Sequence, residues 1–261
     1  MFDIGYRVED LDFHVAMEEV SSGSTDFDVP EKYTVAPNMS TNYQGIGLGK
    51  AGDQWFLTKE DSLESGRTVG GHLVYEALSE HVKFNRPDVG YDEDNGRLIL
   101  EHLGDISDIR FAGLETSVQS EEFIRYLSIK ALAGDDDFGG NIGLKGDKMY
   151  VYDFGGAGDP VKSTLKEINR SLQYINSFLD DEIKIEGIGA CIGIIAEDIE
   201  FSELKEDIRE LKHIYPEYSP ELQNLQENVR DSSKGQLTLM KEENEELKEV
   251  QEAVTRIVNS F

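Results

Sequence analysis

Residues 134–156 read GDDDFGGNIGLKGDKMYVYDFGG, and this stretch constrains the chain more than any other. The short apolar runs Ile142–Leu144 and Met149–Tyr152 stand on either side of KGDK, a pattern typical of a β-hairpin. Three aspartates and an asparagine precede this hairpin, and Asp-Phe-Gly follows it. Because a hairpin brings its two ends together, the stretch predicts a cluster of oxygen donors at the open end of two antiparallel strands.

The spacing of these oxygen donors is specific. Asp136 and Asn141 stand in D-x-x-x-x-N spacing, and Asp153 follows at the end of an apolar strand. In kinase catalytic loops the aspartate of this pair accepts a hydroxyl proton, the asparagine binds a metal ion, and a later aspartate holds Mg²⁺. The pattern therefore predicts Asp136 as the catalytic base and Asn141 and Asp153 as metal ligands.

Two other interpretations use the same aspartates. In a calcium loop that starts at Asp135, positions five and twelve would be Gly139 and Gly146, where an EF-hand needs oxygen ligands, so this interpretation fails. A solvated acidic turn explains Asp135–Asp137 but not Asn141 and Asp153 at their offsets. It remains the alternative to a metal site.

A glycine-rich run upstream leads directly into the strand sequence DQWFLT, and it contains Gly45, Gly47, Gly49 and Gly52. A dinucleotide-binding loop would open a helix instead, so a Rossmann fold is disfavoured. A glycine-rich hairpin can close over nucleotide phosphates because no Cβ blocks its N–H groups. The alternative is an ordinary hairpin turn.

Lys59 ends the strand that follows these glycines. It shares strand parity with Trp55 and Leu57, which predicts that its side chain points toward the interior side of the sheet and can reach the phosphates of a nucleotide. Residues 69–82 have helical periodicity, and Glu76 within them is the nearest candidate to pair with Lys59. Both assignments follow the kinase mechanism.

From Gly45 to Gly158 the chain resembles the protein-kinase-like superfamily, and most closely its atypical branch of HipA-type and phosphatidylinositol 3-/4-kinase-like proteins. The resemblance implies a two-lobed α+β fold, bound ATP and Mg²⁺, Asp136 as catalytic aspartate, Asn141 and Asp153 at the metal, and Lys59 at the phosphates. The sequence departs from this branch at Asp137 and Phe138, where the family usually has Arg-His. A degenerate nucleotide-binding member that serves as an interaction module is therefore an alternative.

Small-molecule phosphotransferases of the aminoglycoside-kinase type share D-x-x-x-x-N and a similar later turn, and they are the second alternative. An acidic cleft suits a cationic amino sugar. Against this class, Gly134 stands where a histidine usually precedes the aspartate by two residues. A hydroxyl of a protein Ser or Thr is the preferred acceptor.

The chain divides by pattern into four parts: an acidic lead-in at 1–40, a strand-rich lobe at 41–103, a mostly helical lobe at 104–236 and a heptad segment at 237–261. Within the helical lobe, residues 120–134 predict a helix that Ser120 caps and Gly134 ends. In the last segment apolar residues recur at heptad spacing, interrupted by Asn244 and Gln251. A coiled coil for self-association or a partner and an amphipathic helix packed on the domain are equally open.

The charge and the single cysteine limit the partners and the compartment. With 53 acidic against 25 basic residues the net charge is −28, which disfavours nucleic acid and anionic membranes as ligands. This acidic composition is also found in proteins from a high-salt cytoplasm. Cys191 stands in an apolar run and is expected to be buried and inert. These features, together with the absence of a signal-peptide pattern, predict a cytoplasmic protein.

Overall fold

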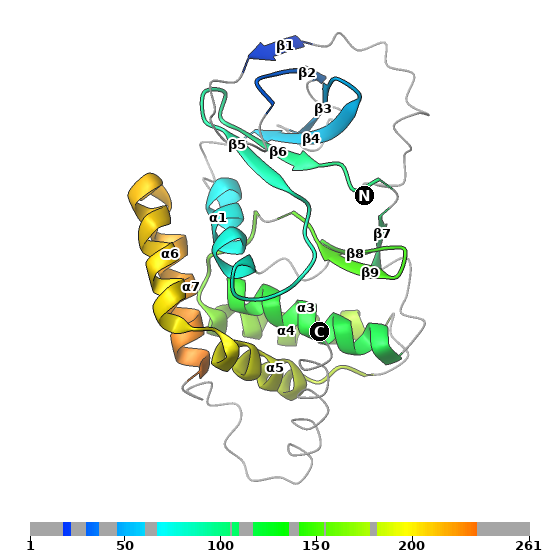
Figure 1. The fold of residues 1–261 in the computed structure, drawn as a ribbon. Coiled ribbons are helices and arrows are strands. Elements are labelled where there is room, and N and C mark those ends of the chain that lie inside the picture. Colours follow the sequence, from blue (N-terminus) through cyan, green and yellow to red (C-terminus); the bar gives the residue numbers. More distant parts are fainter. Residues whose placement is uncertain are drawn as a thin grey trace. The chain divides into compact units, whose positions relative to one another are not determined.

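The computed structural model describes residues 18–21, 30–36, 46–60, 67–104, 106–109, 117–135, 141–153, 155–177 and 182–233. They form an α+β protein of two compact units, one within Met1–Val69 and Arg86–Ser107 and the other within Gly70–Asn85 and Asp108–Phe261. The first unit is built of strands and the second mainly of helices, as the sequence predicted (Figure 1). The predicted heptad segment at 237–261 lies outside the described residues.

The first unit contains one antiparallel sheet of six strands. In chain order they are β1 (Glu18–Ser21), β2 (Lys32–Ala36), β3 (Ile46–Ala51), β4 (Gln54–Glu60), β5 (Val89–Asp92) and β6 (Arg97–Glu101). Their order in the sheet is β1-β2-β3-β4-β6-β5. The chain thus forms four successive strands and leaves the sheet for a helix. It then returns as a hairpin whose second strand, β6, pairs with β4 (Figure 1).

The two faces of β4 differ in burial. Phe56 and Thr58 are 4% and 2% exposed, whereas Trp55, Leu57 and Lys59 share the other face and are half-buried. The alternation predicted from the sequence is therefore present. However, the more deeply buried face belongs to Phe56 and Thr58, so Lys59 lies on the more open side of the sheet.

The second unit is built around one buried helix. Its helices are α1 (Arg67–Ser79, of which the first turn falls in the other unit), α3 (Ser117–Ala133), α4 (Val161–Asn176), α5 (Ile185–Asp198), α6 (Phe201–Ile214), the short 3₁₀ helix η2 (Pro216–Tyr218) and α7 (Ser219–Ser233). Helix α3 packs against α4, α5 and α7. Every residue of 125–135 is buried, including the polar residues Arg125, Ser128, Lys130 and Asp135.

A small sheet accompanies these helices. Strands β8 (Ile142–Lys145) and β9 (Lys148–Val151) form an antiparallel hairpin, and the two-residue strand β7 (Ser107–Asp108) lies next to β8. The hairpin is anchored to α3 because the Tyr126 hydroxyl donates to the Met149 carbonyl at 2.8 Å. The predicted hairpin across KGDK is confirmed.

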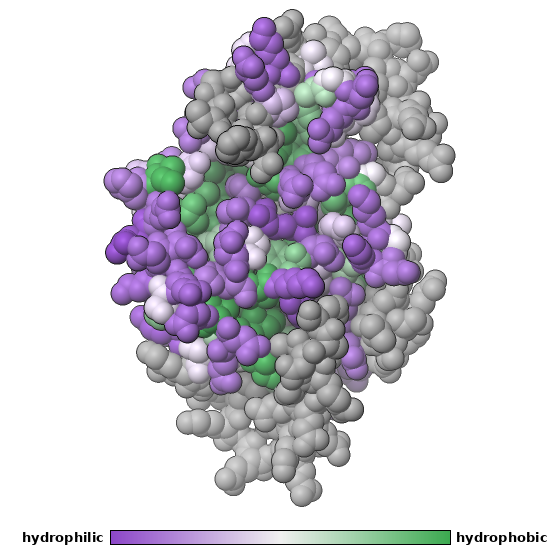
Figure 2. Space-filling model, in the orientation of Figure 1, coloured by the Kyte–Doolittle hydropathy of each residue, from purple (hydrophilic) through white to green (hydrophobic). Residues whose placement is uncertain are grey.

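Helix α3 ends as predicted but begins earlier. Gly134, with a φ of +72°, ends the helix in the left-handed conformation that glycine adopts without strain. The helix starts at Ser117, so Ser120 lies inside the first turn and is not the N-cap residue that the sequence predicted. None of the described helices combines the length and the apolarity needed to cross a membrane. Figure 2 shows hydrophilic residues over much of the described surface on the face drawn.

Candidate active site

The hairpin brings Asn141 next to the strand end that carries Asp153. Ile142 pairs with Val151, and the Tyr152 N–H donates to the Asn141 carbonyl at 2.9 Å, so the pairing continues one step past the strands. Asp153 is the next residue. Two of the three oxygen-donor residues predicted from the sequence therefore lie at neighbouring positions at the open end of β8 and β9.

Both of these residues have an unusual backbone conformation. Asn141 has a φ of 68° and Asp153 a φ of 60°, and among the described residues they are the two non-glycine residues with positive φ. Asn and Asp tolerate this left-handed region better than other residues, yet it remains uncommon and concentrates at functional sites. The backbone thus adopts the left-handed conformation just before β8, at Asn141, and just after β9, at Asp153.

This donor set fits a magnesium ion. Mg²⁺ prefers hard oxygen ligands and is usually bound through one or two carboxylates together with water and substrate phosphates. Asp153 offers a carboxylate and Asn141 an amide oxygen, and both residues are half-buried. The Gly155 N–H approaches Asp153 Oδ1 at 3.5 Å, which is long for a hydrogen bond. The residues present therefore match the predicted ligand.

The aspartates that precede the hairpin have different environments. The Asp135 side chain is fully buried, pairs with Lys130 Nζ at 2.9 Å and accepts a hydrogen bond from the Tyr75 hydroxyl at 2.8 Å. A carboxylate bound in this way is unavailable to a substrate. Asp136, the predicted base, and Asp137 lie outside the described residues. Asp136 directly follows the buried Asp135 in the sequence, and its role remains a prediction.

The peptide before Asp136 is held tightly to the segment after Asp153. The Asp159 N–H donates to the Gly134 carbonyl at 3.0 Å, and the Gly158 N–H donates to the Ala133 carbonyl at 2.9 Å. A Cβ on Gly134 would lie 2.0 Å from the Asp159 carbonyl oxygen. Only glycine permits this approach, so Gly134 fixes the two predicted active-site segments against each other.

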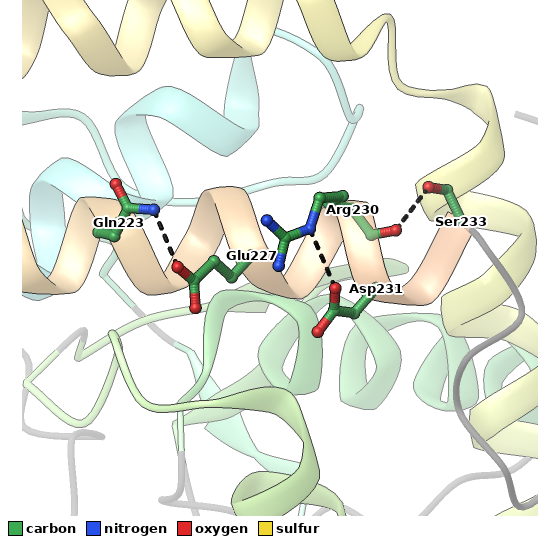
Figure 3. A network of polar contacts seen from close by, with 5 residues as sticks. All are labelled: Gln223, Glu227, Arg230, Asp231 and Ser233. Atoms are coloured by element: carbon green, nitrogen blue, oxygen red, sulfur yellow. Dashed lines mark hydrogen bonds and ion pairs between the residues drawn. The ribbon is translucent and has the colours of Figure 1, made fainter.

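Side chains of helix α7 also hold the segments around Gly134 and Asp159 together. The buried Asn228 side chain donates from Nδ2 to the carbonyls of Leu132 and Asp159, at 3.1 and 2.9 Å, and its Oδ1 accepts from the Val161 N–H at 2.7 Å. Asn224, one turn earlier, donates to the Gly158 carbonyl at 2.7 Å. The more exposed polar residues of α7 interact along the helix instead, as Gln223–Glu227 and Arg230–Asp231 do (Figure 3).

The structure separates the predicted phosphate-binding glycines. Gly47 and Gly49 lie within β3, Gly52 lies in the turn between β3 and β4, and Gly45 falls outside the described residues. Lys59 pairs with Ile46 at the other end of β4 from that turn. At about 3.3 Å per strand residue, Gly52 and Lys59 are about 20 Å apart. Gly52 and Lys59 are therefore too far apart to contact the same phosphate group. Lys59 lies beside Ile46, at the start of β3.

Two of these glycines have structural explanations. A Cβ on Gly49 would lie 2.0 Å from the Phe56 ring, so this glycine makes room for an aromatic side chain of the paired strand. Gly52 has a φ of +58° and open space around its Cβ position, so its backbone conformation is the reason for glycine. Both features belong to the hairpin itself.

Glu76, the predicted partner of Lys59, lies on α1. Val69–Leu78 is otherwise buried throughout, and Glu76 is its one half-buried residue. Lys59 belongs to the first unit and Glu76 to the second, so their pairing stays a prediction. Tyr75, the residue before Glu76, is the one that contacts Asp135.

Sequence reasoning missed the residues that support the site. Lys130, Tyr75 and Asn228 are all buried, and each makes its contacts with residues distant in sequence or across a helix end. The one signal in the sequence was Lys130, a lysine within the apolar run of α3. A charge at such a position predicts a buried partner.

Comparisons with known proteins provide no family for the chain. No family model matches the sequence, and no curated protein matches it either. Among solved structures, a crystal structure of a Helicobacter pylori proinflammatory kinase, CtkA, is similar over 84% of this chain and 94% of that chain, with 11% sequence identity and a TM-score of 0.45. A likeness this slight carries no conclusion about activity.

Proposed function

We propose that the protein is an ATP-dependent phosphotransferase that transfers the γ-phosphoryl group to a hydroxyl, with Ser or Thr of a protein as acceptor in the manner of HipA-type kinases. The observation that carries this proposal is the hairpin end. Asn141 and Asp153 lie there at neighbouring positions, each with positive φ, directly after the segment that contains Asp136. An ordinary acidic turn does not require this arrangement.

Each residue has a separate role in the proposed reaction. Asn141 and Asp153 hold Mg²⁺, Asp136 orients the acceptor hydroxyl and accepts its proton, and Lys59 binds the phosphates of ATP. When bound, Mg²⁺ neutralises negative charge on the β- and γ-phosphates. Glu76 is the proposed partner of Lys59. Positioning of the two substrates supplies most of the rate, because phosphoryl transfer needs little covalent chemistry from the protein.

A small-molecule acceptor is the second candidate, and the charge of the chain favours it. With a net charge of −28, the protein attracts a cationic amino sugar more strongly than a neutral or anionic substrate. Turnover with cationic amino sugars but not with Ser- and Thr-containing peptides would establish this alternative. Mg²⁺-dependent ATP binding without any turnover would instead identify a nucleotide-binding interaction module.

Asp153→Asn and Asp136→Asn test the two roles separately. Asp153→Asn removes one charge from the metal site at constant size, so we expect Mg²⁺-dependent ATP binding to disappear while the circular dichroism spectrum stays unchanged. Asp136→Asn should keep ATP binding but lower kcat roughly 100-fold or more. Asp137→Asn is the matched control, since it changes the neighbouring carboxylate alone.

These measurements belong in both low and high salt, because a chain this acidic repels itself at low ionic strength. Wild-type ATP binding in the Asp153→Asn variant would contradict the metal assignment. Equal loss of binding in the Asp153 and Asp136 variants would show that their roles are confused.

A further inference from the structure

A fully buried ion pair lies next to the proposed catalytic aspartate. Lys130 Nζ is 2.9 Å from Asp135 Oδ2, and both side chains are 0% exposed. The hydroxyl of Tyr75, also fully buried, donates to the same carboxylate oxygen at 2.8 Å. Among the described residues, Asp135 is the group that lies within ion-pair distance of Lys130 Nζ, and this nitrogen makes no hydrogen bond of standard geometry to any of them.

Stability alone is a weak reason for such a pair. Two charges removed from water lose their hydration, and replacing a buried pair by uncharged residues of similar size is often neutral or stabilising. Removing one partner is different, because the other charge then remains buried and uncompensated. The charges therefore restrict the position of Asp135 more than they favour the folded state.

The neighbours of the pair indicate what this restriction does. Asp135 directly precedes Asp136, the proposed base, and Tyr75 directly precedes Glu76 on α1. The backbone is also held, because the Asp135 N–H donates to the Lys130 carbonyl at 2.9 Å. Side chain and main chain of Asp135 are thus both fixed at the point where the chain enters the segment containing Asp136.

We propose that Lys130, Asp135 and Tyr75 are positioning residues for phosphoryl transfer, an inference that rests on the proposed function. They hold the peptide before Asp136 at a single position and link it to α1. The directional hydrogen bond from Tyr75 and the short ion pair with Lys130 act on one carboxylate oxygen, whereas apolar packing alone would tolerate small shifts. A small misplacement of a catalytic group lowers the rate without removing substrate binding, because binding depends on other residues.

Two variants separate positioning from folding. The double variant Lys130→Met with Asp135→Asn removes both charges together, and Tyr75→Phe removes only the hydroxyl. For both we expect a cooperative thermal transition, Mg²⁺-dependent ATP affinity within about 2-fold of wild type, and a kcat at least about 10-fold lower. The single variants Lys130→Met and Asp135→Asn each leave one buried charge and are expected to unfold at lower temperature than the double variant.

Hydrogen exchange provides a readout that does not depend on activity. In Tyr75→Phe, the hydrogen-bonded amides of Gly134 and Asp135 should exchange at least about 10-fold faster than in the wild type. Tyr126→Phe is the matched control: it also removes a buried hydroxyl, but that hydroxyl contacts Met149 and Asn85 rather than Asp135. It should leave exchange at Gly134 and Asp135 unchanged.

The outcomes distinguish this inference from the proposed function. A double variant with wild-type stability and wild-type kcat would show that the pair is only structural. Equal exchange of the Gly134 and Asp135 amides in wild type and Tyr75→Phe would also overturn positioning. If the wild type binds no Mg²⁺-ATP, the proposed function fails. The exchange experiment then still decides whether Tyr75 and Asp135 hold this segment.

Discussion

At Gly134 two separate requirements for glycine coincide. Its φ is +72°, and a Cβ there would meet the Asp159 backbone at 2.0 Å. Gly146 shares only the first requirement, with a φ of +61° and open space at the Cβ position. The two glycines therefore separate the effect of backbone conformation from that of close approach.

We expect Gly146→Ala to lower the free energy of unfolding by about 1 kcal/mol, the usual penalty of a left-handed alanine. Gly134→Ala should lower it by about 3 kcal/mol or more, because backbone atoms of Asp159 must also move. Urea unfolding of both variants measures the difference. Equal losses would mean that the contact between Gly134 and Asp159 is not as tight as the structure shows.

The thiol of Cys191 makes the free energy of unfolding depend on pH in the alkaline range. Burial raises its pKa from 9.0 to about 11 in the folded protein, so the folded state favours the neutral thiol. Below pH 9 the thiol is protonated in both states, and its contribution to stability is fully present. As the pH rises from 9 toward 11, only the unfolded chain ionises, and about 3 kcal/mol of stability is lost.

Cys191→Ala should remove this dependence. We expect the free energy of unfolding of the wild type to fall more steeply above pH 9 than that of Cys191→Ala, because only the wild type carries the buried thiol. Urea titrations at a series of pH values compare the slopes. The native thiol should also resist alkylation at pH 8 and react only after unfolding; parallel slopes and rapid native alkylation would contradict its burial.

At the scale of elements, the sequence pattern correctly predicted the features that depend on neighbouring residues alone. The β8–β9 hairpin follows from two apolar runs around KGDK, and the end of α3 follows from Gly134, whose conformation few other residues adopt. The start of α3 did not follow, because Ser120 is a good N-cap residue but the helix continues back to Ser117. Helix propensity at the first turn is weak, and neighbouring segments decide where the helix begins.

Helix α7 shows why contacts across the fold were missed. Asn228 supports the site through three hydrogen bonds to backbone groups near positions 132, 159 and 161, far away in the chain. Nothing in the sequence around Asn228 reveals those partners. The amide side chain serves here because it both donates and accepts, which a carboxylate of the same shape cannot do.

Asn228→Asp should therefore be strongly destabilising. The new carboxylate cannot donate to the carbonyls of Leu132 and Asp159, so we expect a loss of about 2–4 kcal/mol in the free energy of unfolding. Asn224→Asp, which loses a single half-buried contact to Gly158, should lose about 1 kcal/mol. Chemical denaturation ranks the two, and the reverse order would argue against Asn228 as the joint between α7 and the site.

For the whole molecule, the sequence predicted a strand-rich part before a helical part, and the structure confirms that order. The predicted metal ligands Asn141 and Asp153 were close to each other because a hairpin determines their distance. The glycine loop was harder, since G-x-G-x-x-G has more than one structural origin. Here Gly49 accommodates Phe56 and Gly52 forms a turn, so the hairpin itself explains these two glycines, and phosphate binding by the loop stays a prediction.

Lys59 is the residue of the strand-rich unit on which nucleotide binding most depends in the proposed function. It lies on the half-buried face of β4, paired with Ile46. Lys50 lies near the opposite end of the same hairpin, with its Nζ 4.9 Å from the Trp55 ring centre, and this cation–π contact explains its position without a ligand. The two lysines form a matched pair on adjacent strands.

Lys59→Met should weaken Mg²⁺-ATP binding or slow single-turnover phosphorylation by a few kcal/mol, because a charge-assisted contact to the phosphates is lost. Lys50→Met should change stability by about 0.5 kcal/mol and leave ATP affinity unchanged. Calorimetric titration with ATP compares both variants with an active wild type. Loss of affinity at Lys50 but not at Lys59 would transfer the phosphate contact to the turn end of the hairpin. If both variants bind ATP as the wild type does, the strand-rich unit contributes no phosphate-binding lysine at either position, and the kinase interpretation of this unit is wrong.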